Sequence, residues 1–262
     1  VMNKTQAIVI EADGNDELHQ DIKPEEDPLK LSREDLLEKI KAAGIVGLGG
    51  ATFPTHVKLS PPKDKKIDLL FMNGAECEPY LTCDHRLMVE QGEKIVRGLE
   101  IAAKILDVDK VYLGIERNKP DAIEKLKSII DEFKLDKFHV VGLDVKYPQG
   151  AEKMLIYAIS GRKVPPGGLP LDVGVVVLNA GTSRAIYDAV YEGMPLIERV
   201  VTVTGAVKRP SNLLTRIGTP ASFLIEKAGG PAGDIGKIIS GGPMMGIAQY
   251  TDEFPVVKGT SG

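Results

Sequence analysis

The sequence predicts an α/β fold: a mostly parallel, Rossmann-like sheet with helices on both faces, followed by a small α+β domain. Three observations predict it. Strand and amphipathic-helix patterns alternate four times between residues 67 and 192. Polar, glycine-bearing segments follow three of these strands, where parallel sheets place their ligand crevice. Near Arg199 the pattern changes to short strands separated by Gly and Pro turns, which indicates a second, smaller domain.

The composition is that of a globular protein. The chain has 262 residues, 43% hydrophobic and 27% charged, with a net charge of −4. This charge balance argues against a nucleic-acid partner. No run reaches the roughly 18 apolar residues of a transmembrane segment, and no signal peptide is recognised. The few cysteines favour the cytoplasm, and the start at Val1 leads us to expect an excised fragment.

The order of the patterns divides the chain. Residues 1–28 are predicted to be a strand, Ala7–Ile10, and a linker from a truncated N-terminal domain. A capping box at Ser32 predicts a helix that stops at Gly44. Residues 29–198 are expected to form the α/β domain. Its strands are predicted at 67–72, 111–115, 138–145 and 173–178, and its later helices at 87–106, 120–133, 150–160 and 184–192.

The remaining chain reads as a small α+β domain over residues 199–250 and an extended tail over 251–262. Alternating residues predict a half-exposed strand at 200–207. The other expected elements are a strand at 213–217, a short helix from Pro220 to Ala228, a strand at 237–240 and a glycine-rich turn at 241–246.

The most distinctive segment is the glycine loop, Gly44–Lys58. Gly47, Gly49 and Gly50 allow a ligand to approach bare main chain. Thr52 is predicted to cap a helix that opens at the proline two residues later. A glycine loop that runs into a helix start binds phosphate well. Because the loop follows a helix rather than a strand, we reject the dinucleotide fingerprint. A flexible turn between two helices is an open alternative.

Polar segments follow the first, third and fourth strands, at residues 73–86, 147–152 and 179–183. The carboxyl ends of parallel strands meet at one sheet edge, so these segments should converge. The glycine loop would join them only if its helix packs over the same edge.

The side chains in these segments suit a ligand with a phosphate, several hydroxyls and a flat polar ring. Asn73 and Glu76 can hydrogen-bond hydroxyls, whereas Asn179, Thr182 and the adjacent helix start can hold phosphate. Taken singly, Glu76 and Glu78 are ordinary surface carboxylates. The convergence of the segments favours the ligand site.

Other reactive side chains predict no further chemistry. His56 and His85 could be acid–base groups or metal ligands, but neither has a recognised metal spacing, so we expect no metal site. Cys77 and Cys83 could be a redox pair, although the absence of C-x-x-C favours packed, reduced thiols. Lys163 opens a Pro- and Gly-rich segment that is either a mobile flap over the crevice or a plain surface loop.

Two motifs resemble those of a known family. One is Gly47-Leu-Gly-Gly-Ala-Thr-Phe-Pro54 with Lys58. The other is Asn73-Gly-Ala-Glu-Cys-Glu-Pro-Tyr80 with Cys83-Asp-His-Arg-Leu-Met88. From about residue 30 to 250 the chain resembles the RnfC component of the Rnf electron-transport complex, a relative of the flavin-bearing, NADH-oxidising subunit of respiratory complex I. Residues 199–250 resemble the β-grasp domain of the SLBB type in both families.

The resemblance implies bound FMN and a hydride exchanged between NADH/NAD⁺ and FMN within a membrane-associated ferredoxin:NAD⁺ oxidoreductase. It implies a peripheral position on the cytoplasmic face of the cell membrane, with other Rnf subunits as partners and ferredoxin as an indirect one. Family members carry two 4Fe-4S motifs after the β-grasp domain. None occurs here, so the clusters are expected in a missing C-terminal region. Because cofactors exchange the hydride, no catalytic side chain is expected.

The resemblance also assigns roles by position. The FMN residues would be Gly47, Gly49, Gly50, Lys58, Asn73, Glu76, Asn179 and Thr182. The residues facing NAD(H) would be Phe53, Glu78, Gly150, Glu152 and Lys163.

Four positions depart from the complex I pattern, which has an arginine at Leu48, an aspartate at Ala75, an acidic residue at Ala151 and an aromatic at Gly167. They motivate an alternative: a non-catalytic scaffold or partner-binding subunit that binds flavin weakly or not at all. A third interpretation is an unrelated phosphate-sugar-binding α/β protein.

Overall fold

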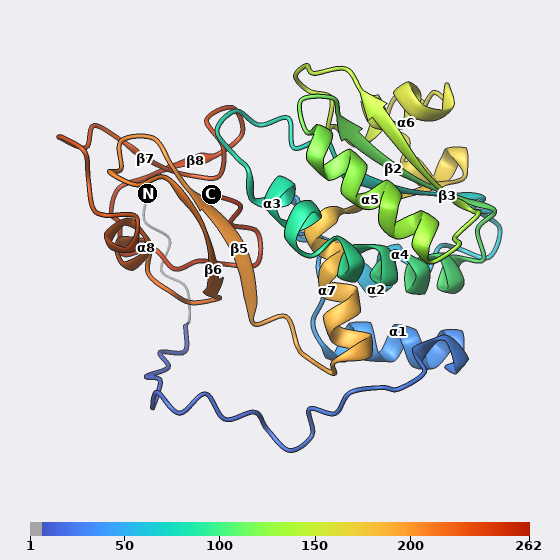
Figure 1. Ribbon diagram of the computed structural model, residues 1–262, viewed down its shortest axis with the longest axis horizontal. Helices are drawn as coiled ribbons and strands as arrows, with labels where there is room; N and C mark the ends of the chain where they lie inside the picture. Colours follow the sequence, from blue (N-terminus) through green and yellow to red (C-terminus); the bar gives the residue numbers. More distant parts are fainter. Residues whose placement is uncertain (1–6) are drawn as a thin grey trace.

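The computed structural model describes residues 7–262, so the part of the predicted N-terminal strand-and-linker region at residues 1–6 lies outside it. Its body is a four-stranded sheet in the order β3-β2-β1-β4, with every pair parallel (Figure 1). The strands are β1 (Leu69–Gly74), β2 (Lys110–Glu116), β3 (Phe138–Leu143) and β4 (Val175–Asn179). The predicted parallel sheet is confirmed.

Helices cover both faces of this sheet, as predicted. They are α1 (Arg33–Ala42), α2 (Thr55–Lys58), α3 (Cys83–Glu90), α4 (Gly92–Leu106), α5 (Pro120–Glu132), α6 (Glu152–Ser160) and α7 (Ala180–Tyr191), with 3₁₀ turns η1 (Pro28–Lys30) and η2 (Pro170–Val173). Leu70 and Met72 of β1 join the hydrophobic cluster of α4, α5 and α7, whereas Leu69 and Phe71 join the cluster of α6. Neighbouring strand residues point to opposite faces, so both faces of β1 are buried.

Helices α4 and α7 pack against each other at very short range. A Cβ placed on Gly98 would lie 1.8 Å from the carbonyl oxygen of Ser183. Only the absence of a side chain at Gly98 allows the two backbones this approach. This contact holds the start of α7 against α4.

Several boundaries differ from the prediction. The long helix breaks at Gln91, whose φ of −128° and ψ of 30° are not helical. Strand β3 ends at Leu143, and α6 starts after the extended Ala151. Ala7–Ile10 are exposed and pair with no strand within residues 7–262, so their assignment to a strand of a truncated domain stays a prediction. Ser32 does cap its helix, accepting a hydrogen bond from Asp35 N.

The smaller region lies beside the sheet (Figure 1). Strands β5 (Glu198–Val203) and β6 (Ser211–Arg216) pair antiparallel, as do β7 (Ile238–Ser240) and β8 (Ile247–Gln249), and α8 (Ala221–Lys227) lies between the two pairs in sequence. Strand β8 was not predicted. Val201, Leu224 and Val256 share the core of this region. The tail is partly built in, because Thr202 N donates to Ser261 O and Gly241 N to Gly262 O. The exact domain limits stay a prediction.

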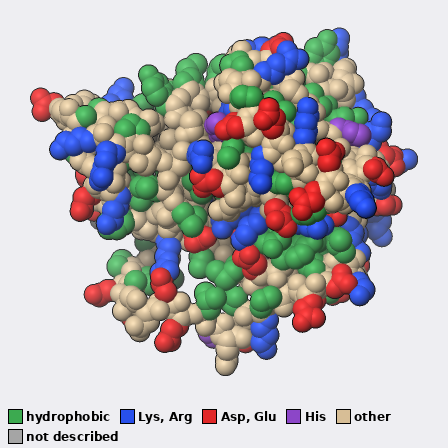
Figure 2. Space-filling view, viewed as in Figure 1, with side chains coloured by type: hydrophobic (Ala, Val, Ile, Leu, Met, Phe, Trp, Pro, Cys, Tyr) green, Lys and Arg blue, Asp and Glu red, His purple; other side chains and the backbone are tan. Residues whose placement is uncertain are grey.

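Within residues 7–262, no helix has both the length and the apolar character that crossing a bilayer requires. The face drawn in Figure 2 intersperses acidic and basic side chains. That mixture matches the small net charge of the sequence.

Candidate functional site

The carboxyl edge of the sheet brings two asparagines together. Asn73 is the penultimate residue of β1 and lies beside Asn179, its register partner at the end of β4. Asn73 Nδ2 donates to Gly150 O at 2.7 Å, which ties the segment after β3 to β1. Asn179 Oδ1 accepts from Gly181 N and Thr182 N, at 2.8 and 3.3 Å, and so caps α7. The predicted convergence of three strand ends is therefore present.

The glycine loop packs over the same edge. Leu48 N donates to the hydroxyl oxygen of Thr182 at 2.9 Å. A Cβ placed on Gly49 would lie 3.6 Å from the Cβ of Asn179. The loop expected to join the sheet edge thus meets the start of α7 directly.

The loop does not form the capped helix that the sequence predicts. Thr52 has a φ of +51°, and α2 starts at Thr55 with Pro54 as its N-cap and no side-chain cap. The Thr52 cap is therefore wrong: the left-handed backbone of Thr52 belongs to the turn, which closes through Thr52 N and Gly47 O at 3.1 Å. Helix α2 has four residues, too few for a strong dipole.

Three consecutive amides of the loop are free instead. Within residues 7–262, the N–H groups of Gly49, Gly50 and Ala51 donate to no protein acceptor, and all three residues are exposed. Gly50 has a φ of +109°, which a residue with a side chain rarely adopts. Successive unpaired amides form a concave anion-binding nest.

Lys58, predicted to bind FMN, contacts Glu152, predicted to face NAD(H). Lys58 Nζ lies 2.5 Å from Glu152 Oε1, with the lysine side chain 28% exposed. Phe53, within the glycine loop, is exposed. Lys163 is exposed and lies over the ring of Tyr157, so the structure does not bring it into the hydrogen-bonded edge.

Glu76 holds the start of α3. Its carboxylate accepts from Asp84 N at 2.7 Å and from His85 N at 3.0 Å. Burial, and then the nearby charge of Asp84, raise the pKa of Glu76 to about 7. Burial also raises the pKa of Asp84, which accepts from Asn179 Nδ2 at 2.6 Å.

One cluster consists of residue types that can bind a metal ion. Oxygen and sulfur atoms of Glu76, Cys83 and Asp84 lie within 4.8 Å of one another. Both carboxylates already accept hydrogen bonds from the protein, and burial raises the pKa of the Cys83 thiol well above its usual value. Through these hydrogen bonds the cluster links the start of α3 to Asn179.

Glu78 reaches the small region. Its carboxylate accepts from Met244 N at 3.2 Å and Met245 N at 2.7 Å. A Cβ on Gly242 would lie 2.4 Å from Glu78 Cδ, so a side chain at this position would displace the Glu78 carboxylate. Gly150, the other predicted NAD(H) residue here, donates from its N–H to Cys77 Sγ at 3.2 Å.

Sequence reasoning missed three charged residues around this edge. Asp84 stands inside the second motif, so that motif offered a signal. Lys119 is buried and donates from Nζ to Ala75 O at 2.7 Å. Arg199 is 4% exposed, and its place in an alternating strand pattern offered no signal.

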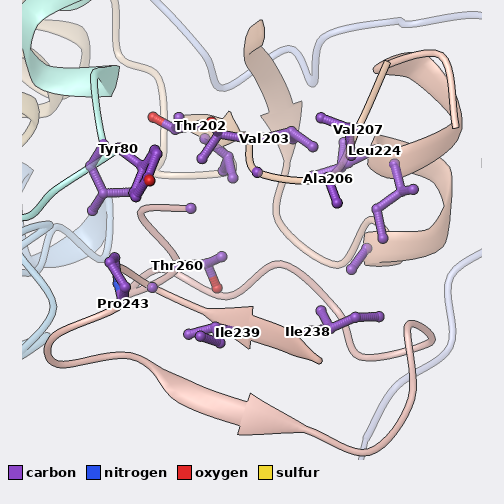
Figure 3. Close-up of a pocket in the computed structure, with 18 of the residues that line it drawn as sticks. Tyr80, Thr202, Val203, Ala206, Val207, Leu224, Ile238, Ile239, Pro243 and Thr260 are labelled. Atoms are coloured by element: carbon purple, nitrogen blue, oxygen red, sulfur yellow. The ribbon is translucent and has the colours of Figure 1, made fainter. Parts of the chain in front are cut away.

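Two cavities flank residues 78–81. One, of about 460 Å³, is lined by Glu76, Glu78, His85 and Lys119 among others. The second, of about 420 Å³, is largely apolar and lies within the small region; Figure 3 shows Val203, Leu224 and Ile239 around it. Tyr80 and Leu81 line both, so this segment separates the polar edge from the apolar interior.

Comparison with known proteins gives the family. Residues 40–188 match the family described as the Nuo51 FMN-binding domain, and residues 200–248 match the SLBB domain. In fold, the chain is similar to a crystal structure of an NAD⁺-reducing [NiFe]-hydrogenase. The TM-score is 0.74 at 22% identity, covering 87% of this chain and 46% of that one.

Two curated relatives are similar over 99% of this chain. Both are the component designated C of a ferredoxin:NAD(+) oxidoreductase complex. One, from the proton-translocating complex of Clostridium ljungdahlii, is 56% identical. The other, from the Na(+)-translocating complex of Acetobacterium woodii, is 50% identical. The chain covers 56% and 58% of their lengths, a little over half.

These matches confirm the resemblance and the SLBB domain predicted from sequence. The chain therefore belongs to the Nuo51 FMN-binding domain family and, within it, to the RnfC family.

Proposed function

We propose that this chain binds FMN at the carboxyl edge of its sheet and exchanges a hydride between NAD(H) and that flavin. The family membership supports a redox subunit that works within a ferredoxin:NAD⁺ oxidoreductase complex. When bound, the flavin would supply the chemistry: it takes a hydride and releases electrons singly. The side chains would bind, orient and exclude water.

The observation that carries this proposal is the row of free amides at Gly49, Gly50 and Ala51 beside Asn179. This row is a seat for an anion such as the FMN phosphate. Asn179 and Thr182 hold the wall behind it rather than presenting free donors.

The remaining predicted residues would take supporting roles. Asn73 would fix the segment after β3 while its strand end faces the ligand, and Glu76 would fix the start of α3. Lys58, which is paired with Glu152 in this structure, would exchange that partner for an anionic oxygen of the ligand. Alternatively, it would keep the pair and orient Glu152 toward a ribose hydroxyl of the nucleotide.

For the nicotinamide nucleotide we propose the exposed rim of the same edge. Phe53 would stack on a flat ring. Glu78, Gly150 and Glu152 would line the rim, and Lys163 would close over it from its Pro- and Gly-rich loop.

The setting of the reaction is also a proposal. The relatives are named as subunits of complexes. We propose that this chain is a peripheral subunit at the cytoplasmic face of the cell membrane, that its direct partners are other Rnf subunits, and that electrons reach ferredoxin through 4Fe-4S clusters outside residues 7–262.

Titration of the protein with FMN tests the proposal. Quenching of flavin fluorescence with saturation at micromolar FMN is the expected result, followed by bleaching of the flavin absorbance band when NADH is added. Bleaching shows that the bound flavin accepts the hydride. Binding without bleaching would restrict the chain to holding flavin.

A second candidate function has one observation in its favour. Lys58 is paired with Glu152, and both oxygens of Glu78 are occupied by backbone amides. A scaffold that has lost flavin would satisfy its polar groups internally in this way. Absence of FMN binding up to millimolar concentration, with the fold intact, would favour this scaffold.

A further inference from the structure

Arg199 belongs to the small region but lies against the cofactor edge of the larger one. It is the second residue of β5 and is 4% exposed. Its guanidinium donates from Nη2 to Leu48 O at 3.4 Å, from Nη1 to Lys258 O, and from Nε to Val200 O at 3.3 Å. One planar group therefore links the glycine loop, the C-terminal segment and its own strand.

Leu48 is held at both of its backbone groups. Its N–H donates to Thr182 Oγ1, and its carbonyl accepts from Arg199. The peptide that joins Leu48 to Gly49 is planar and trans, so its C=O and N–H point in opposite directions. By holding the Leu48 carbonyl, Arg199 sets the direction of the Gly49 N–H, the first of the three free amides.

The C-terminal segment reinforces the same loop. Lys258, whose carbonyl binds Arg199, donates from Nζ to Gly44 O at 2.6 Å. A Cβ placed on Gly259 would lie 3.2 Å from Gly50 O. Residues 258–259 thus run beside the loop and share Arg199 with it.

We propose that Arg199 is a positioning residue for the cofactor site: it aims the glycine-loop amides at their anion. The proposal rests on the proposed function only for the identity of that anion, the FMN phosphate. Three carbonyls in different directions require the rigid fork of a guanidinium, which the single ammonium of lysine does not reproduce. Burial lowers the pKa of Arg199, while Cys83 and Asp84 beside it favour its charged form.

Arg199→Lys and Arg199→Met test this role, with Arg216→Met as the matched control. Arg216 lies on the neighbouring strand β6 and is 58% exposed, so its loss should leave the loop unchanged. We expect both Arg199 variants to raise the dissociation constant of FMN by about 10- to 100-fold, the range for losing a charge-assisted hydrogen bond. If the methionine variant fails to fold, the lysine variant, which keeps the positive charge, still tests the proposal.

Hydrogen exchange without FMN supplies the second readout. The amides of Leu48 and Thr52 are hydrogen-bonded in the loop, and both should exchange faster in the Arg199 variants while β5 and β6 keep their protection. If wild-type protein binds no FMN, the proposed function fails, and this exchange still decides the role of Arg199.

Two outcomes would overturn the positioning role. One is full retention of FMN affinity by Arg199→Lys, which would show that charge alone suffices. The other is faster exchange across β5–β8 equal to that in the loop, which would make Arg199 a general packing residue.

Discussion

Two segments that touch at the sheet edge, residues 47–52 and residues 179–184, are built in opposite ways. The start of α7 is buried, and Asn179 satisfies its Gly181 and Thr182 amides. The glycine loop is exposed at residues 49–52 and leaves three amides free. The first segment binds its Gly181 and Thr182 amides within the protein, whereas the second offers three amides to a ligand.

The difference separates two parts of the site. Residues 179–184 and the groups that hold them form a structural part, called the wall here, and residues 47–52 form a ligand-binding part, called the seat. Polar groups that are satisfied inside the protein fix geometry, and unsatisfied groups at a rim are solvated until a ligand replaces the water. Changes to the wall should therefore reduce stability and ligand binding together. Changes to the seat should reduce binding while the unfolding temperature stays nearly constant.

Gly98→Ala should give the largest effect on the wall. The new Cβ would lie 1.8 Å from Ser183 O, so α4 must move away from α7. We expect a loss of about 3 kcal/mol in the free energy of unfolding, measured by urea denaturation. Gly236→Ala is the control, because a Cβ there meets nothing within 4 Å. Equal stability of the two variants would contradict the tight α4–α7 contact.

Asn179→Ala should come next. It removes the cap of α7 and leaves the buried carboxyl of Asp84 without its amide donor. The expected loss is about 2 kcal/mol of stability, accompanied by weaker FMN binding. Asn15→Ala, at an exposed asparagine, should change neither quantity. Loss of binding without loss of stability would place Asn179 in the seat instead.

The sheet and its helices could be predicted from the sequence, because hydrophobic periodicity depends on neighbours along the chain. The contact between the glycine loop and α7 could be predicted only on the condition that the loop packs over the same sheet edge. Nothing in residues 47–50 indicates which helix they contact. The resemblance was needed to name the family, and the curated relatives confirm it.

The missed features share a cause. Arg199 and Asp84 act through partners more than 90 residues away in sequence, and no local pattern encodes such a partner. The predicted strand at Ala7–Ile10 has the same dependence: its apolar residues fit a strand, but no partner strand lies beside them within residues 7–262. Strand propensity needs a neighbour to pair with.

The pH dependence of stability tests the structural role of Glu76 in the wall. Glu76 has a folded pKa of about 7 against an ordinary 4.5, so between these values the folded protein binds more protons than the unfolded chain. Its contribution is complete below about pH 4.5 and is lost as the pH rises through 7. Wild type should therefore lose stability relative to Glu76→Gln over this range. Parallel pH profiles of the two proteins, followed by thermal unfolding, would contradict the raised pKa.

Lys58→Met should give the smallest change in stability and the clearest separation of seat from wall. The Lys58–Glu152 pair is partly exposed, and such pairs contribute at most about 1 kcal/mol. If Lys58 serves the ligand, FMN affinity should fall by about 10-fold while the unfolding temperature hardly changes. Lys153→Met, one residue beyond Glu152 and exposed, should retain affinity. Unchanged FMN affinity in Lys58→Met would show that this lysine only holds α6, through its ion pair with Glu152. The seat would then consist of the loop amides alone.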